Sequence, residues 1–169
     1  EIDRQKCAHE FRITDTKITH KKTKTRFIFR GLHRNWTAIK GIAGLTLIWV
    51  EEAENISRKS WDVLTPTLRG SDKGEIWVSF NPDKETDATY GDFVLPYISQ
   101  LKSNGGTYSD DMLALVKINY TDNPWFPKIL RDEMERTRLL SEIRYLNIWE
   151  GHLSMPESQI IKAEWWHYY

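Results

Sequence analysis

The fold of this chain is decided by the stretch Leu45-Thr46-Leu47-Ile48-Trp49-Val50-Glu51-Glu52-Ala53-Glu54. Its first six residues are apolar or β-branched, and two adjacent carboxylates follow them directly. A short apolar run without polar alternation is typical of a strand that is buried on both faces, as in a parallel sheet covered by helices. The stretch therefore predicts an α/β fold with residues 45–50 as a core strand.

Glu51 and Glu52 come at the carboxyl end of this predicted strand, where ligands bind in open α/β sheets. Because adjacent strand residues point to opposite faces, the two glutamates can have different tasks. One can hold a hydrated Mg²⁺ ion while the other orients and deprotonates water, which is the Walker B arrangement of P-loop ATPases with an added catalytic glutamate. The alternative is that both glutamates only open the following helix, whose dipole favours negative charge at its start.

A second strand of the same kind is predicted for Gly74–Pro82, with Ser79 and Asn81 at its end. In such ATPases, a polar residue at the tip of the strand after the Walker B strand senses the γ-phosphate. Between the two strands, Ser57–Arg69 has helical spacing. Its first residue is the expected N-cap, and Pro66 should kink or shorten the helix. Strand, helix and strand together predict a βαβ unit.

A third apolar run, Met112–Tyr120, predicts another strand, and Asn119 and Asp122 are assigned to turn chemistry at its end. Short antiparallel strands are expected nearer the N-terminus, at residues 10–14, 17–20 and 25–30. Helices are expected at residues 1–8, 35–42, 86–102, 127–140 and 141–149, and a flexible loop at 103–107. Pro96 weakens the prediction for the third of these helices.

The chain has eight tryptophans, which is a high count for 169 residues. Trp49 and Trp77 lie within the proposed core strands and are most simply core residues. Trp61, Trp125 and Trp149 are also expected to pack against other side chains. Trp165 and Trp166 belong to an aromatic group at the end of the chain, which would form an exposed patch unless it docks on another surface.

Overall charge argues for no particular partner, because 24 Lys and Arg balance 24 Asp and Glu. A local basic run is formed by Lys17, His20, Lys21, Lys22, Lys24 and Arg26. A basic hairpin tip of this kind can contact phosphates, although an ordinary solvated hairpin is the favoured interpretation. Cys7 is the single cysteine, which fits a reducing cytosol, and five scattered histidines form no metal-ligand pattern. No apolar run approaches the ~20 residues that span a membrane, and no signal peptide is recognisable.

Several segments in this order carry a family resemblance. They are Glu51–Glu54, Trp61–Leu64, Thr67–Arg69, Trp77–Pro82 and Asn119–Pro124, together with Phe27–Leu32, Ile39–Ile42 and Asn147–Gly151. The series closely resembles the large terminase subunit of tailed double-stranded DNA bacteriophages, the ATP-driven motor that packages viral DNA into an empty head. The resemblance covers roughly residues 10–169. Each segment alone is weak, whereas the ordered series is specific.

The resemblance implies a role for each candidate site residue. Glu51 matches the acid associated with Mg²⁺, through water, and Glu52 matches the catalytic glutamate that polarises the attacking water. Ser79, Phe80 and Asn81 match the motif that couples nucleotide state to movement. The cofactors implied for the complete protein are ATP and Mg²⁺. The implied partners are double-stranded DNA, the portal protein, the small terminase subunit and other large subunits, in the host cell cytoplasm and with no membrane.

The 169 residues contain no Gly-x-x-x-x-Gly-Lys-Ser/Thr loop and no nuclease segment with an acidic metal cluster. Residues 1–152 are therefore expected to form the C-terminal part of an ATPase domain, and residues 153–169 the connector toward a nuclease domain. The expected fold is an incomplete P-loop NTPase domain, with a mainly parallel sheet flanked by helices and an antiparallel hairpin near the N-terminus. Whether the chain is a fragment, a processed piece or a short gene product is left open.

Two further expectations follow from that missing loop. The chain alone should not hydrolyse ATP, and the alternative function is that of a non-enzymatic fragment or relic that binds motor subunits or DNA. In the family's sheet, the strand that leads into the phosphate loop lies beside the strand ending at Asn81. Without it, residues 76–80 should form an open sheet edge, with Trp77 exposed and the chain prone to associate.

Overall fold

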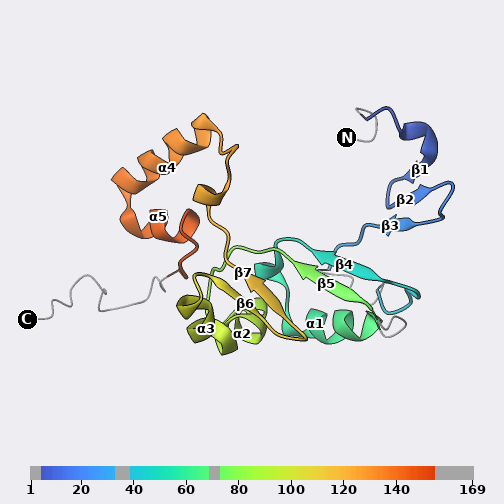
Figure 1. Cartoon of the computed structure of the whole chain (residues 1–169), viewed down its shortest axis with the longest axis horizontal. Coiled ribbons are helices and arrows are strands. Elements are labelled where there is room, and N and C mark those ends of the chain that lie inside the picture. The colour runs from blue at the N-terminus through green and yellow to red at the C-terminus, as the bar shows by residue number, and fades with distance from the viewer. Residues whose placement is uncertain (1–4, 33–38, 69–72, 155–169) are drawn as a thin grey trace, which may run out of the picture.

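A computed structural model describes residues 5–32, 39–68 and 73–154 of the chain (Figure 1). The strands are β1 (Phe11–Thr14), β2 (Lys17–His20), β3 (Arg26–Ile28), β4 (Leu47–Val50), β5 (Glu75–Val78), β6 (Thr107–Ser109) and β7 (Ala114–Val116). The helices are α1 (Arg58–Leu64), α2 (Ala88–Phe93), α3 (Ile98–Ser103), α4 (Lys128–Leu140) and α5 (Glu142–Ile148). Short 3₁₀ turns lie between them, and no helix within the described ranges is long and apolar enough to cross a membrane.

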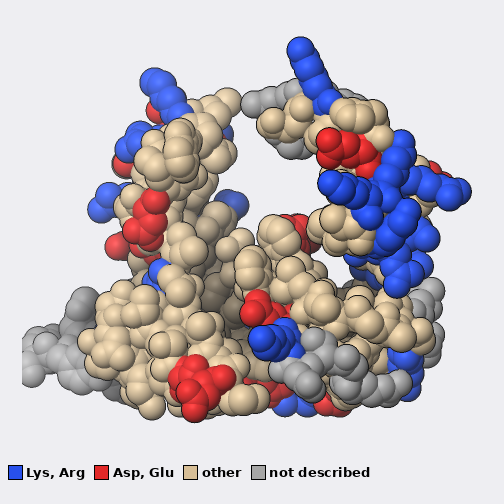
Figure 2. Space-filling model, turned by 45° about the vertical axis from the view of Figure 1, so that its right-hand side comes forward, with Lys and Arg blue, Asp and Glu red and all other residues tan. Residues whose placement is uncertain are grey.

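The elements form a central body and two projections (Figure 1). The body contains β4, β5, β6, β7 and helices α1 to α3. The β1–β3 sheet and the α4–α5 helix pair project from it on the same side, and the space-filling view shows an open hollow between them (Figure 2). Half of the predicted helix at 35–42 and half of the expected helix at 1–8 lie outside the described residues, as do residues 155–169 of the connector. The described halves, 39–42 and 5–8, contain turns and no α-helix, so these two predictions are wrong there.

The predicted βαβ unit is confirmed. Strands β4 and β5 pair in parallel, with Leu47 opposite Glu75 and Val50 opposite Val78, and α1 connects them. The hydroxyl of Ser57 caps α1 by accepting a hydrogen bond from the backbone N–H of Ser60 at 3.2 Å. Helix α1 ends at Leu64 and a 3₁₀ turn follows, because Pro66 cannot continue α-helical hydrogen bonding.

Only one face of the β4–β5 pair is covered. Val50 belongs to the first hydrophobic cluster, which we define as Ile39, Val50, Ala53, Trp61 and Leu64, and Ile48 and Ile76 pack against that cluster. The opposite face carries Trp49, 64% exposed, and Trp77, 55% exposed. The prediction that this strand is buried on both faces, with Trp49 and Trp77 in the core, is therefore wrong, because no described element covers the second face.

The parallel pairing stops at β5, which has β4 as its only strand partner among the described residues. This agrees with the expectation of an open edge at residues 76–80 and of an exposed Trp77. The expectation of one mainly parallel sheet is wrong for the described residues, because their strands divide into three small sheets and two of these are antiparallel. The described residues form a mixed α/β fold in which β4 and β5 are the one parallel pair.

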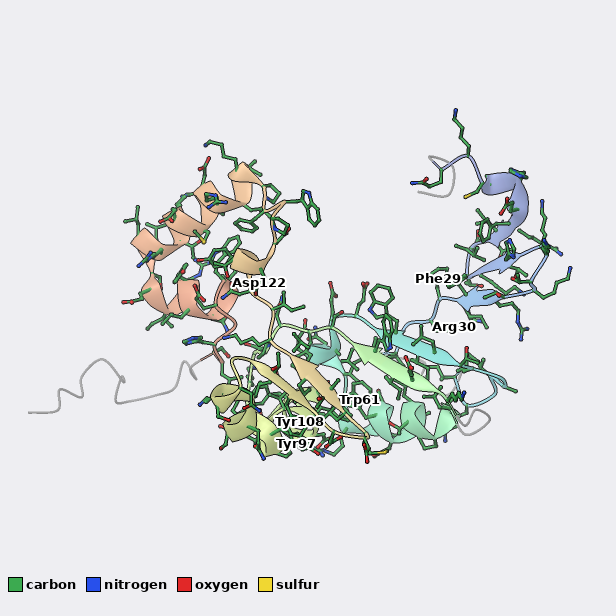
Figure 3. The ribbon with its side chains drawn as sticks, viewed as in Figure 1. Phe29, Arg30, Trp61, Tyr97, Tyr108 and Asp122 are labelled. Atoms are coloured by element: carbon green, nitrogen blue, oxygen red, sulfur yellow. The ribbon has the colours of Figure 1, made fainter. Side chains whose placement is uncertain are left out.

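A second hydrophobic cluster lies where α2 and α3 pack near the β6–β7 hairpin. We define it as Tyr90, Val94 and Leu101. These residues come from the segment 86–102, which the sequence predicts to be one helix. Pro96 breaks it into α2, a 3₁₀ turn at Leu95–Tyr97 and α3. Tyr97 stacks on Tyr108 with ring centroids 4.6 Å apart (Figure 3). Strand β6 begins at Thr107, so the expected flexible loop 103–107 ends in a strand instead.

The predicted strand over 112–120 is confirmed only at Ala114–Val116, and turn chemistry follows it as expected. Asn119 and Asp122 form a reciprocal capping box around a 3₁₀ turn. The amide of Asn119 also donates to Glu150 at 2.6 Å, and the hydroxyl of Tyr145 donates to the same carboxylate at 2.5 Å. These bonds tie the α4–α5 pair to the segment that leaves β7.

The same carboxylate makes this junction sensitive to acid. The hydroxyl of Tyr145 holds the pKa of Glu150 below its ordinary value, with smaller contributions from Asn119 and Tyr120. A carboxylate whose pKa is depressed by folding contributes stability above its unfolded pKa, and loses it as the pH falls through the folded pKa.

Trp149 packs edge-on against Tyr120 and Phe126, as expected. Trp125 is 85% exposed, so the prediction that it packs against other side chains is wrong.

Candidate active site

Glu51 and Glu52 leave the carboxyl end of β4 with both side chains exposed. The backbone of Glu52 is left-handed, with φ 51° and ψ 43°, and its carbonyl accepts from Asn55 as a 3₁₀ turn begins at Ala53. The alternative predicted that the glutamates open a helix, but only this short 3₁₀ turn follows them directly. A left-handed glutamate costs about 1–2 kcal/mol relative to ordinary backbone, a kind of strain that gathers at functional sites.

Ser79 lies beside these glutamates because the two strands run in parallel and end together. Its backbone N–H donates to the carbonyl of Val50 at 2.9 Å, and its carbonyl accepts from Ala53 at 3.2 Å. Backbone hydrogen bonds between Ser79 and the residues just before and just after the two glutamates therefore hold Glu51 and Glu52 next to the end of β5. The structure thus brings together Glu51, Glu52 and Ser79, where the carboxyl ends of the two parallel strands meet.

Phe80 and Asn81 continue from Ser79 in different environments. Asn81 is exposed, whereas Phe80 is half-buried and packs against both the first and the second hydrophobic clusters. Two residues further on, the carbonyl of Asp83 accepts from the backbone N–H of Ser154 at 2.6 Å and from its hydroxyl at 3.0 Å. The segment behind Asn81 is thereby attached to the described end of the chain.

A buried polar chain supports the end of β4 from below, and sequence reasoning missed it. The indole N–H of Trp61 donates to the hydroxyl of Thr89 at 3.0 Å, and that hydroxyl donates to the carbonyl of Ala53 at 2.5 Å. Thr89 and Ala53 are fully buried, and Trp61 lies in α1 beneath the strands (Figure 3). The chain fixes the residue directly after Glu52. A threonine inside a helical pattern gives no signal of such a role.

We expect Thr89→Val to lower the free energy of unfolding by about 1–3 kcal/mol, because it leaves the Trp61 indole N–H buried without a partner. The Ala53 carbonyl loses one of its two hydrogen bonds and keeps the one from the backbone N–H of Ile56. The valine keeps the shape of the side chain, so the loss reports the hydroxyl. Urea denaturation followed by tryptophan fluorescence measures it. Thr86→Val, at an exposed position, is the matched control and should change stability by less than about 0.5 kcal/mol. Equal stabilities for the two variants would refute the supporting role.

The donor atoms at this strand end suit a magnesium ion. Mg²⁺ prefers oxygen ligands, keeps several of its waters, and is usually held by one or two carboxylates and by substrate phosphates. Glu51, Glu52 and Ser79 offer two exposed carboxylates and a hydroxyl at one edge of the sheet. Within the described ranges, no group of three or more His, Cys, Asp or Glu side chains is arranged to hold a metal ion.

A concavity among the described residues lies elsewhere. It has a volume of about 480 Å³ and is open to solvent. Its lining comes from α3 and the β6–β7 hairpin, and includes Gln100, Tyr108 and Leu115. None of the five predicted site residues contributes to it. The candidate site is therefore an exposed strand edge and not a closed pocket.

Comparison with known proteins identifies the family. The model of the phage terminase large subunit family matches residues 1–152, which is most of the chain. A search of curated proteins finds no match. The family match supports a role in phage DNA packaging, with DNA and the packaging machinery as partners in general. The chain belongs to the phage terminase large subunit family.

Proposed function

We propose that these residues form the water-activating and coupling part of the terminase ATPase that drives double-stranded DNA into the prohead. The observation that carries the proposal is the parallel β4–β5 pair, which presents Glu51, Glu52 and Ser79 together at its carboxyl edge. Residues 1–152 are proposed to belong to the ATPase domain and 153–169 to a connector. Because the 169 residues contain no glycine-lysine phosphate loop, the proposal assigns that loop to a segment outside them.

Within this proposal, each glutamate has one task. Glu52 accepts a proton from the attacking water and holds that water in line with the γ-phosphate. Glu51 would hold Mg²⁺ through water, and the ion would supply positive charge to the phosphate oxygens. The left-handed backbone of Glu52 and the buried Trp61–Thr89–Ala53 chain fix the direction in which that side chain leaves the strand. Exposure of both carboxylates leaves room for ATP to enter between them and the missing loop.

Coupling is proposed to run through Phe80 and Asn81. Asn81 is exposed at the sheet edge and would meet the γ-phosphate, while Phe80 behind it packs between the two hydrophobic clusters. A shift of Asn81 on hydrolysis would therefore reach both halves of the central body. Through Asp83 and Ser154 it would also reach the start of the connector. The portal protein, the small terminase subunit and other large subunits are the proposed partners of that movement.

The proposal predicts that Asn81→Ala impairs DNA packaging but leaves ATP binding almost unchanged. In a terminase chain that carries both the phosphate loop and these residues, the rate of DNA packaging should decrease by about 5- to 150-fold, which is the usual effect of losing the coupling between two sites. ATP affinity should change by no more than about twofold, because Asn81 contacts one phosphate group among many. Packaging of a linear DNA and binding of a fluorescent ATP analogue measure the two quantities.

Asn55→Ala is the matched control, since Asn55 is an exposed asparagine in the turn after the glutamates. It should leave both packaging and binding unchanged. If Asn81→Ala weakens ATP binding as much as it weakens packaging, Asn81 is a structural turn residue and the coupling assignment fails.

A further inference from the structure

Positive charge is concentrated in the β1–β3 projection. Residues 5–32 contain eight Lys and Arg but only two Asp and Glu, a formal net charge of +6. The other described residues, 39–68 and 73–154, contain twelve Lys and Arg and seventeen Asp and Glu, a net charge of −5. Figure 2 shows the basic side chains gathered over the projection, with mixed charge elsewhere. The net charge of the chain is zero, but positive charge is concentrated in residues 5–32 and negative charge in the other described residues.

Strand pairing sorts the residues of this sheet into two faces. Arg12 lies opposite Thr19, which lies opposite Arg26, so the three share one face. Lys17 lies on the same face, two residues before Thr19 along β2. The other face carries Phe11, Ile13, Ile18, His20 and Phe27. Since neighbouring strands are about 4.8 Å apart, Arg12 and Arg26 project from columns roughly 10 Å apart. One face of the sheet is thus a compact cationic surface.

The turn between β2 and β3 extends this surface and is held in one conformation. The Nδ1 atom of His20 lies 2.7 Å from the hydroxyl of Thr23, which in turn lies 2.8 Å from the hydroxyl of Thr25. Lys24 takes a left-handed backbone, with φ 63°, where glycine would be the usual residue. The turn therefore keeps a lysine at a position that costs backbone strain, next to the exposed Lys22.

The cationic groups of this surface have no hydrogen-bond or ion-pair partner among the described residues. They belong to Arg12, Lys17, Lys22, Lys24 and Arg26, all of which are exposed. An ordinary solvated hairpin mixes charges of both signs, so that each cation has an acid nearby. Here the sheet's two acids are Glu10, which lies near His9 and His20, and Asp15. The surface is therefore built as an array of like charges that a polyanion would neutralise.

We propose that the β1–β3 sheet and its turn bind the phosphate backbone of double-stranded DNA through Arg12, Lys17, Lys22, Lys24 and Arg26. The choice of DNA rests on the proposed packaging function. Contacts from lysine and arginine to phosphate carry no sequence information, so binding is independent of sequence, as a motor that moves along a genome requires. The surface is separate from Glu52 and Asn81, which belong to the strand ends of the central body.

The test is the salt dependence of DNA binding by the 169-residue chain, with a labelled random 30-base-pair duplex and fluorescence anisotropy as the readout. Five phosphate contacts predict a slope of log affinity against log salt near −4.5, or about a 500-fold loss of affinity between 50 and 200 mM salt. Lys22→Ala with Lys24→Ala should reduce the slope to about −2.7. Lys22→Arg with Lys24→Arg keeps both charges and should restore it.

Lys84→Ala with Lys102→Ala is the matched control, because it removes two exposed lysines from the central body. Its slope should equal that of the original chain. Equal slopes for the two alanine pairs would overturn the proposal, as would a chain that shows no salt-dependent binding. Stronger competition by an RNA duplex than by DNA would show that the partner is RNA. The assay contains no ATP, so these failures leave the ATPase proposal standing, and that proposal fails instead on the Asn81→Ala experiment.

Discussion

Glu52→Gln should bind ATP and fail to cleave it. In a terminase chain that contains the phosphate loop and these residues, we expect hydrolysis to fall by about 10²- to 10⁴-fold, the usual contribution of a general base. Glutamine keeps the size and hydrogen bonding of the side chain but cannot accept the proton. The left-handed backbone at this residue is unchanged, so the amide should occupy the place of the carboxylate. Release of phosphate and binding of a fluorescent ATP analogue measure the two effects.

Glu51→Ala should give the opposite pattern. If Glu51 holds Mg²⁺ through water, its loss should weaken Mg·ATP binding by about 10- to 100-fold, as the loss of outer ligands commonly does. Hydrolysis at saturating Mg²⁺ should then recover in part. Glu85→Gln, an exposed glutamate in the segment after β5, is the control for a generic loss of negative charge. Equal loss of binding in the Glu51 and Glu52 variants would count against separate roles.

The second large effect concerns the uncovered face of β4 and β5. We expect the 169-residue chain to self-associate at micromolar concentrations, because another chain can cover the exposed apolar face and can also pair with the open edge beside it. Trp49 and Trp77 lie side by side on that face, 64% and 55% exposed. Covering one such half-exposed indole would remove about 100 Å² of apolar surface from water, worth roughly 2.5 kcal/mol. Trp49→Lys with Trp77→Lys should therefore shift the chain to a monomer.

Sedimentation velocity over a range of concentrations measures this shift, and Trp125→Lys is the matched control. Trp125 is exposed as well, at 85%, but it lies outside the β4–β5 sheet, so its replacement should leave association unchanged. A chain that stays monomeric at high concentration, melts sharply and protects the β5 backbone from hydrogen exchange would contradict the open edge.

The parts of this fold that sequence predicts are those with local causes. The βαβ unit is marked by two apolar runs, a serine cap and a proline stop, and α4 begins within one residue of its predicted start. The adjacency of Glu51 and Ser79 follows from the same pattern, because parallel strands place their carboxyl ends together. Thr89 could not be found in this way, since its hydrogen bonds join residues 28 and 36 positions away.

The error on the burial of β4 arises because an apolar pattern shows which residues are hydrophobic and not which face another element covers. All four residues of β4 are apolar, so the pattern cannot show that Ile48 and Val50 face α1 while Leu47 and Trp49 face outward. The β6–β7 hairpin was missed for a different reason. Its turn is made by Asp110, whose carboxylate accepts from the backbone N–H groups of Met112 and Leu113, without the glycine that usually marks a hairpin.

The position of Phe80 between the two hydrophobic clusters has a consequence for how the molecule unfolds. Both clusters pack against the Phe80 ring. If either cluster unfolds, the ring becomes exposed to water, and the remaining cluster becomes less stable. The central body should therefore lose its structure in a single cooperative transition, although its strands belong to separate sheets. The amides that are hydrogen-bonded within the body should then exchange together, at the rate of this one transition, whereas the unpaired edge of β5 exchanges faster.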